Sequence, residues 1–134
     1  MGYRSEVLLA IAFENTEQME EVWAIYCLDP KVQATDVSNH WSRNTEGKYP
    51  TMAYYTDGAK WYDDYEDVQA FEHMRTVAGT FVESRKFNYA WIKYRIGEEN
   101  NDIEVEELAS DAGYPLSEYL WERAAIVRHI EHSF

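Results

Sequence analysis

An unbroken run of apolar residues stands near the start of the chain, from Val7 to Phe13. Its alternating positions are apolar on both sides: Val7, Leu9, Ile11 and Phe13 on one, and Leu8, Ala10 and Ala12 on the other. A strand with one solvated face would alternate apolar and polar residues instead. The pattern therefore predicts a strand over residues 3–13 in the centre of a sheet.

Three later segments carry apolar residues at helical spacing, and we predict a helix over each. The first, 16–28, has Asn15 or Thr16 in the position of a capping side chain. Its apolar positions are Met19, Val22, Trp23 and Tyr26. The second, 64–83, has a stripe of Val68, Phe71, Met74 (or Arg75), Ala78 and Val82. The third, 115–132, has Leu116, Leu120, Ala124, Val127 and Ile130 on one side.

Shorter alternating segments predict the other strands, at 32–37, 51–62, 86–96 and 102–108. Residues 38–50 are typical of a polar loop, and 97–101 of a hairpin loop. Asp57 and Gly58 indicate a turn or bulge, so 51–62 is either a strand pair or one bent strand. The order of elements predicts an α+β fold with a single antiparallel or mixed sheet and helices on one face. We expect a ferredoxin-like core with an added strand and a C-terminal helix.

Composition favours one compact domain over residues 1–134. The chain is 46% apolar and 16% aromatic, which is too much for a disordered acidic tail. Its formal charge of −13 disfavours binding to nucleic acid or to an anionic membrane. Neither a membrane-spanning run nor a cleavable signal pattern is evident, and the single Cys27 excludes an internal disulfide. These features favour a cytoplasmic protein.

The negative charge is concentrated in three segments. Residues 97–111 hold seven acids and no base, residues 57–72 hold six acids and one lysine, and residues 14–21 hold four acids. On a strand, Asp102, Glu104 and Glu106 share one face, about 7 Å apart. With Asp63, Asp64, Glu66 and Asp67, this row could imitate a phosphate backbone towards a basic protein. The simpler interpretation is that these acids are solvated, and that those at the start of the helix interact favourably with the helix dipole.

One later segment combines aromatic and basic residues. Phe87, Tyr89 and Trp91 share a strand face with Lys93 and Arg95, as in sheets whose aromatic side chains stack bases. An alternative function is therefore a single-stranded nucleic-acid-binding module. The net charge opposes it, and packing of these rings under a helix explains the pattern as well.

No catalytic constellation, metal site or cofactor motif is evident in the sequence. There is no phosphate-binding loop, nucleophile elbow or metalloprotease motif. His129 and His132 could share a helix face, but no third ligand accompanies them. We therefore expect a protein that is not an enzyme and holds no cofactor.

Three short motifs carry a resemblance: GYRSEV at 2–7, KWY at 60–62 and YRIGE at 94–98. Taken together, they resemble a group of small uncharacterised proteins of tailed bacteriophages and prophages. The resemblance implies a phage accessory protein that acts in the bacterial cytoplasm, and it carries over no functional residue.

These observations lead to the hypothesis of an acidic phage accessory protein that binds and inhibits a host protein with a basic surface. The target could be a defence enzyme or a nucleic-acid-handling enzyme. We also expect a homodimer, because Tyr119, Trp121 and Ile126 would leave an apolar strip on the last helix.

Overall fold

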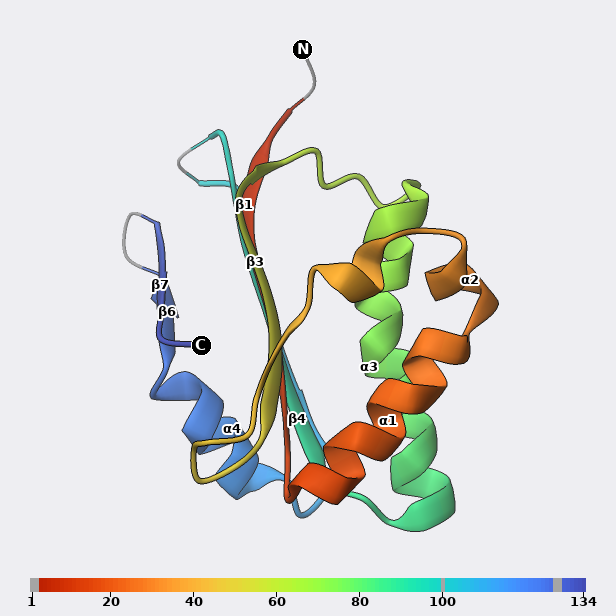
Figure 1. Ribbon diagram of the computed structural model, residues 1–134. Helices are drawn as coiled ribbons and strands as arrows, with labels where there is room; N and C mark the ends of the chain where they lie inside the picture. The colour runs from red at the N-terminus through yellow and green to blue at the C-terminus, as the bar shows by residue number, and fades with distance from the viewer. Residues whose placement is uncertain (1–2, 100, 127–128) are drawn as a thin grey trace.

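A five-stranded antiparallel sheet divides the molecule into two layers of side chains (Figure 1). The computed structural model describes residues 3–99, 101–126 and 129–134. The strand order is β2-β3-β1-β4-β5. The strands are β1 (Ser5–Phe13), β2 (Ser42–Asn44), β3 (Thr51–Ala59), β4 (Tyr89–Gly97) and β5 (Ile103–Ala109). The α+β class with a single main sheet is thus confirmed, whereas the ferredoxin-like description stays a prediction.

Helices cover both faces of the sheet, and the expectation of helices on one face is wrong. On one face lie α1 (Thr16–Leu28), α2 (Pro30–Gln33) and α3 (Glu66–Arg85), while α4 (Tyr114–Trp121) packs on the other (Figure 1). The reason is visible in β1. Val7, Leu9 and Ile11 pack in the core under α1 and α3, and Leu8 and Ala10 pack in a second core with α4. A strand that is apolar on both sides needs a cover on both sides.

The segment from residue 32 to residue 50 departs from the elements predicted for it. Residues 32–37 contain no strand, because Pro30 at the first helical position and the Asp29 side chain, which accepts from Lys31 N–H, begin α2. A 3₁₀ turn, Val37–Asn39, follows it, and the loop 38–50 includes the short edge strand β2.

The last predicted helix, 115–132, is wrong beyond Trp121. There the chain forms a small hairpin, β6 (Ala124–Ile126) and β7 (Ile130–His132). Ala124 and Ile130 are buried against the α4 side of the sheet, so a hairpin also satisfies their apolar spacing. Val127 lies outside the described residues.

Other predicted boundaries agree closely with the structure. Asn15 caps α1 through its side-chain oxygen, which accepts from Gln18 N–H at 2.9 Å. Residues 51–59 form one strand whose pairing with β1 shifts register opposite Asp57 and Gly58, as expected of a bulge.

In the described ranges, no helix has the length and apolar character needed to cross a membrane.

Candidate functional site

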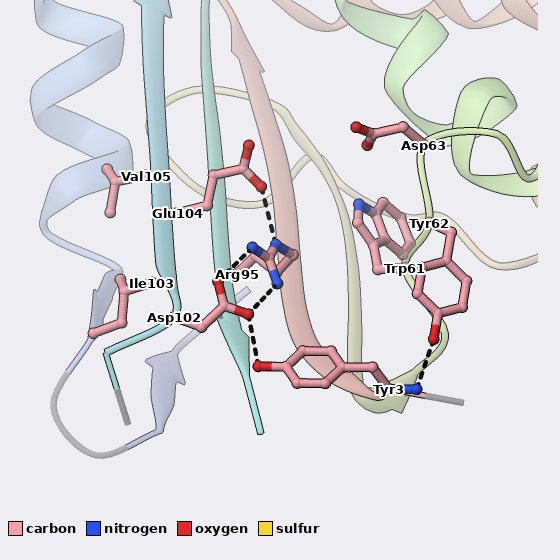
Figure 2. Close-up of a pocket in the computed structure, with 9 residues that line it drawn as sticks. All are labelled: Tyr3, Trp61, Tyr62, Asp63, Arg95, Asp102, Ile103, Glu104 and Val105. Carbon is pink, nitrogen blue, oxygen red and sulfur yellow. Dashed lines mark hydrogen bonds and ion pairs between the residues drawn. The ribbon is translucent and has the colours of Figure 1, made fainter. Parts of the chain in front are cut away.

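A cavity of about 700 Å³ lies at one end of the sheet. Three segments distant in sequence meet there: Tyr3 before β1, the connection from β3 to α3, and the β4–β5 hairpin. Figure 2 shows the side chains of Trp61, Tyr62 and Asp63 on one side, those of Arg95, Asp102 and Glu104 on the other, and Tyr3 between them. Ile103 and Val105 also line it, but their side chains point away from Arg95 (Figure 2). The described lining is thus made of carboxylates, one arginine, aromatic rings and two aliphatic side chains.

Arg95 holds the two carboxylates of the hairpin wall in place. Its Nη2 donates to Asp102 Oδ1 at 2.8 Å and its Nη1 to Asp102 Oδ2 at 3.2 Å. Its Nε donates to Glu104 Oε1 at 3.0 Å, and Nη1 also donates to Ser5 Oγ at 3.1 Å. The hydrogen bond from Arg95, followed by the one from Tyr3, holds the pKa of Asp102 below its ordinary value. This wall is therefore a pre-arranged ion-pair network.

Tyr3 joins the two walls of the cavity. Its hydroxyl donates to Asp102 Oδ2 at 2.7 Å, and its backbone N–H donates to the Tyr62 hydroxyl at 2.6 Å. Close packing with Gly97 makes this contact possible, because a Cβ at Gly97 would overlap both the Tyr3 hydroxyl and the Asp102 carboxylate. A side chain at position 97 would therefore displace the ends of the Tyr3 and Asp102 side chains.

Trp61 adds an unsatisfied donor to the lining. The side chain is buried, with 8% of the residue exposed, and its indole N–H has no hydrogen-bond partner among the described residues. A buried donor without a partner costs free energy unless an acceptor reaches it. The indole nitrogen is itself buried, so it is Asp63, which has no ion pair among the described residues, that leaves the lining open to a basic group.

The acids predicted from the sequence separate into two groups. Asp63, Asp64, Glu66 and Asp67 are exposed at the start of α3, and in the part of the chain that the structure describes they form no ion pair. We call these four residues the α3 acidic cluster. Asp63 faces Asp102 and Glu104 across the cavity, so the fold brings the two acidic segments to one place.

The three acids predicted to share a face of β5 already form ion pairs with basic residues of the protein. Asp102 pairs with Arg95, Glu104 with both Arg95 and Lys93, and Glu106 with Arg75. Glu106 also accepts from the Trp91 indole at 2.8 Å. The row therefore lies beside α3 as part of an internal network, and it is not a line of free charges at phosphate spacing.

The sequence prediction missed Arg95, Lys93 and Tyr3 as partners of these acids, and Trp61 as part of the cavity lining. A signal was present for the first two. Lys93 and Arg95 lie on the same face of β4 as Glu106 and Glu104 on β5, directly opposite them in the ladder. Alternating bases on one strand of a hairpin and alternating acids on the other predict cross-strand ion pairs. Tyr3 and Trp61 reach the site through tertiary packing, for which the sequence carried no local signal.

The three aromatic residues considered for base stacking do not form an open surface. Trp91 is completely buried in the core under α3, and Phe87 stacks on Phe81 with ring centroids 5.4 Å apart. Tyr89 is half-buried against the same core. Base stacking on Trp91 would require α3 to leave the sheet.

The described residues offer no group of three histidine, cysteine, aspartate or glutamate side chains arranged to hold a metal ion. His132 lies in β7 and His129 precedes that strand, so these two do not share a helix face. Cys27 is half-buried, and burial raises the pKa of its thiol.

Comparison of the chain with protein-family models, with curated proteins and with solved structures found no match.

Proposed function

We propose that this chain is a non-enzymatic binding protein that takes a basic segment of another protein at the rim of the cavity. One observation carries the proposal. The α3 acidic cluster has no ion pair among the described residues, and its Asp63 lines a cavity of about 700 Å³ whose opposite side carries Asp102 and Glu104, both paired with Arg95. Negative charge placed around a cavity attracts a basic partner and speeds its approach.

The resemblance of residues 2–7, 60–62 and 94–98 to phage proteins supports a more specific form of the proposal. In that form the partner is a bacterial host protein, such as a defence or nucleic-acid-handling enzyme, and binding in the host cytoplasm inhibits it. Imitation of a phosphate backbone then rests on the α3 acidic cluster, because Arg95, Lys93 and Arg75 neutralise the acids of β5.

The test is a binding titration with a labelled lysine- and arginine-rich peptide at low and moderate salt. The test variant neutralises the α3 acidic cluster: Asp63→Asn, Asp64→Asn, Glu66→Gln and Asp67→Asn. The matched control removes four exposed acids elsewhere: Glu17→Gln, Glu46→Gln, Glu118→Gln and Glu122→Gln. Four exposed ion pairs, each contributing about 0.3–0.5 kcal/mol, predict roughly a tenfold loss of affinity for the test variant.

The control has the same change of net charge, so an equal loss in both variants would contradict a specific site. Capture from bacterial lysate with the same three proteins then identifies the partner. A host protein that is retained by wild type and by the control, but not by the test variant, supports the inhibitory form.

A further inference from the structure

Strand β5 is an edge of the sheet, and its outer side is open. It pairs with β4 and ends the strand order. Gly97 N–H donates to the Asp102 carbonyl, and Ser110 N–H donates to the Tyr89 carbonyl, at the two ends of this pairing. Because inward and outward groups alternate along an antiparallel strand, the N–H and C=O groups of Ile103, Val105 and Glu107 point away from β4. Within the described ranges, these backbone groups have no hydrogen-bond partner.

The two faces of this edge differ in chemistry. On the α3 side are Asp102, Glu104 and Glu106, and on the α4 side are Ile103, Val105 and Glu107. Ile103 is 48% and Val105 is 54% exposed, although they lie across the ladder from Ile96 and Tyr94 of the second core. The seven residues of this edge strand thus carry glutamates as well as exposed aliphatic side chains, and such an open edge can accept another strand whose charges are complementary.

We propose that β5 receives an extended segment of the partner as an added antiparallel strand, in which basic residues alternate with aliphatic ones. The inference rests on the proposed function and gives its binding mode. The aliphatic side chains cover Ile103 and Val105 and extend the core beside α4. The basic side chains lie next to Asp102, Glu104 and Glu106. Backbone hydrogen bonds to the outward groups of β5 supply affinity, and the alternation supplies specificity.

Charge balance on the α3 side favours a basic segment. Three bases, Lys93, Arg95 and Arg75, meet four acids: Glu72, Asp102, Glu104 and Glu106. The Glu104 side chain keeps 46% of its surface exposed. A carboxylate has about four acceptor positions, so Glu104 can pair with Arg95 on the inner side and with an added base on the outer side.

The same charges disfavour a second copy of this chain as the occupant. In a twofold antiparallel pairing centred on Val105, Glu104 of each copy would lie opposite Glu106 of the other. Like charges directly opposite one another are destabilising in a sheet. Each copy also carries a formal charge of −13.

The experiment uses a seven-residue peptide of alternating lysine and valine, measured by fluorescence anisotropy against the full chain. Directly opposed residues have side chains on the same face, so the peptide valines lie opposite Ile103 and Val105 and direct their N–H groups at β5. Methylation of the backbone nitrogens of the valines should lower affinity at least about tenfold. It removes the N–H donors directed at β5, and the added methyl groups keep the peptide from approaching the strand. Methylation of the backbone nitrogens of the lysines, whose N–H groups point away from β5 into solvent, should change affinity less than about twofold.

Two protein variants provide the reciprocal test. Val105→Pro removes an outward N–H that the ladder does not use, and proline is tolerated at such edge positions. It should lower affinity by less than methylation of all the valine backbone nitrogens does, because it removes a single donor. Val105→Thr retains the N–H and the branched side chain, and should bind as wild type does. Circular dichroism checks that both variants fold, and the methylated peptides test the inference with the wild-type protein alone.

Each outcome decides between the two proposals. Equal binding of both methylated peptides would overturn strand addition, while loss of binding on neutralising the α3 acidic cluster would still support a basic partner. A lack of binding by any basic peptide would overturn the proposed function and, with it, this inference. A wild-type dimer that Val105→Pro converts to a monomer would show that a second copy occupies the edge, and would also overturn the inference.

Discussion

Lys93 of β4 donates a hydrogen bond of 2.6 Å to Glu72 of α3, linking the sheet to its longest helix. Only 4% of Lys93 is exposed, and Glu104 lies 3.3 Å from the same ammonium group. Burial alone would lower the pKa of Lys93, but the hydrogen bonds and charges of the two carboxylates outweigh it and raise the pKa. The lysine therefore remains charged inside the protein because two acids reach it.

Replacing Glu72 alone should lower the free energy of unfolding more than replacing both Glu72 and Lys93. Glu72→Leu leaves a buried ammonium with only Glu104, and we expect a loss of unfolding free energy near the lower end of about 3–5 kcal/mol. In the double variant Glu72→Leu with Lys93→Leu, apolar packing replaces the pair, and the loss should be smaller than in Glu72→Leu alone. Urea unfolding of the three proteins measures this difference. A double variant less stable than Glu72→Leu would contradict the account.

The contact between Tyr3 and Asp102 should depend on Gly97. In Gly97→Ala the new methyl group displaces the ends of both side chains, and we expect a loss of about 1 kcal/mol, because these ends can move without disturbing the core. Gly58→Ala is the matched control, since nothing lies within 4 Å of a Cβ there. Thermal unfolding compares the two, and nuclear magnetic resonance of the Tyr3 ring reports the loss of its contact. Equal effects of both substitutions would rule out the steric explanation.

The network around Asp102 predicts a dependence of stability on pH. Because Arg95 holds the pKa of Asp102 below its ordinary 3.8, the stabilisation is present above pH 3.8 and is lost as pH falls through the lower pKa of the folded state. In Arg95→Gln the carboxyl should titrate closer to 3.8, as measured by carbon-detected magnetic resonance. Arg43→Gln, which breaks a pair with Glu20 elsewhere, should leave this titration unchanged. A midpoint for Asp102 above 3.8 in the wild-type protein would refute the assignment.

Lys86 ends α3 in the left-handed region, with φ of 58°. A side chain is strained there, whereas glycine adopts this conformation freely. Lys86→Gly should therefore stabilise the protein by about 1 kcal/mol. Ser84→Gly, inside the same helix, should destabilise it by up to about 1 kcal/mol. If the melting temperatures of both variants move in the same direction, the explanation by strain at Lys86 is contradicted.

Local patterns predicted most of the main sheet and two of its helices. The apolar run 7–13 and the capping Asn15 are strong local signals, and the structure follows them within a few residues. The last segment failed because apolar spacing alone does not separate a helix from a helix followed by a hairpin. Glu6 on β1 accepts a hydrogen bond of 2.9 Å from Ile130 N–H, and this tertiary contact is one that local sequence does not reveal.

The apolar strip that motivated the homodimer expectation also lies in this last segment. Tyr119 is buried, where it packs against Tyr49, so the apolar strip expected on the last helix is not formed as described. A homodimer stays a prediction without that support. For the acidic residues, the sequence correctly indicated which side chains share a face of β5. It did not reveal how many of them are neutralised, because that depends on a helix packed against the strand.

The central place of β1 has a consequence for synthesis of the chain. Its neighbours are β3 and β4, and Ser5 pairs with Gly97, about 90 residues later. At the usual 5–20 residues per second, the ribosome needs roughly 5–20 s to add that stretch. During this time the most apolar strand of the molecule has no partner on its β4 side. The nascent chain is therefore exposed to aggregation until β4 emerges, and a chaperone that binds extended apolar segments would protect it.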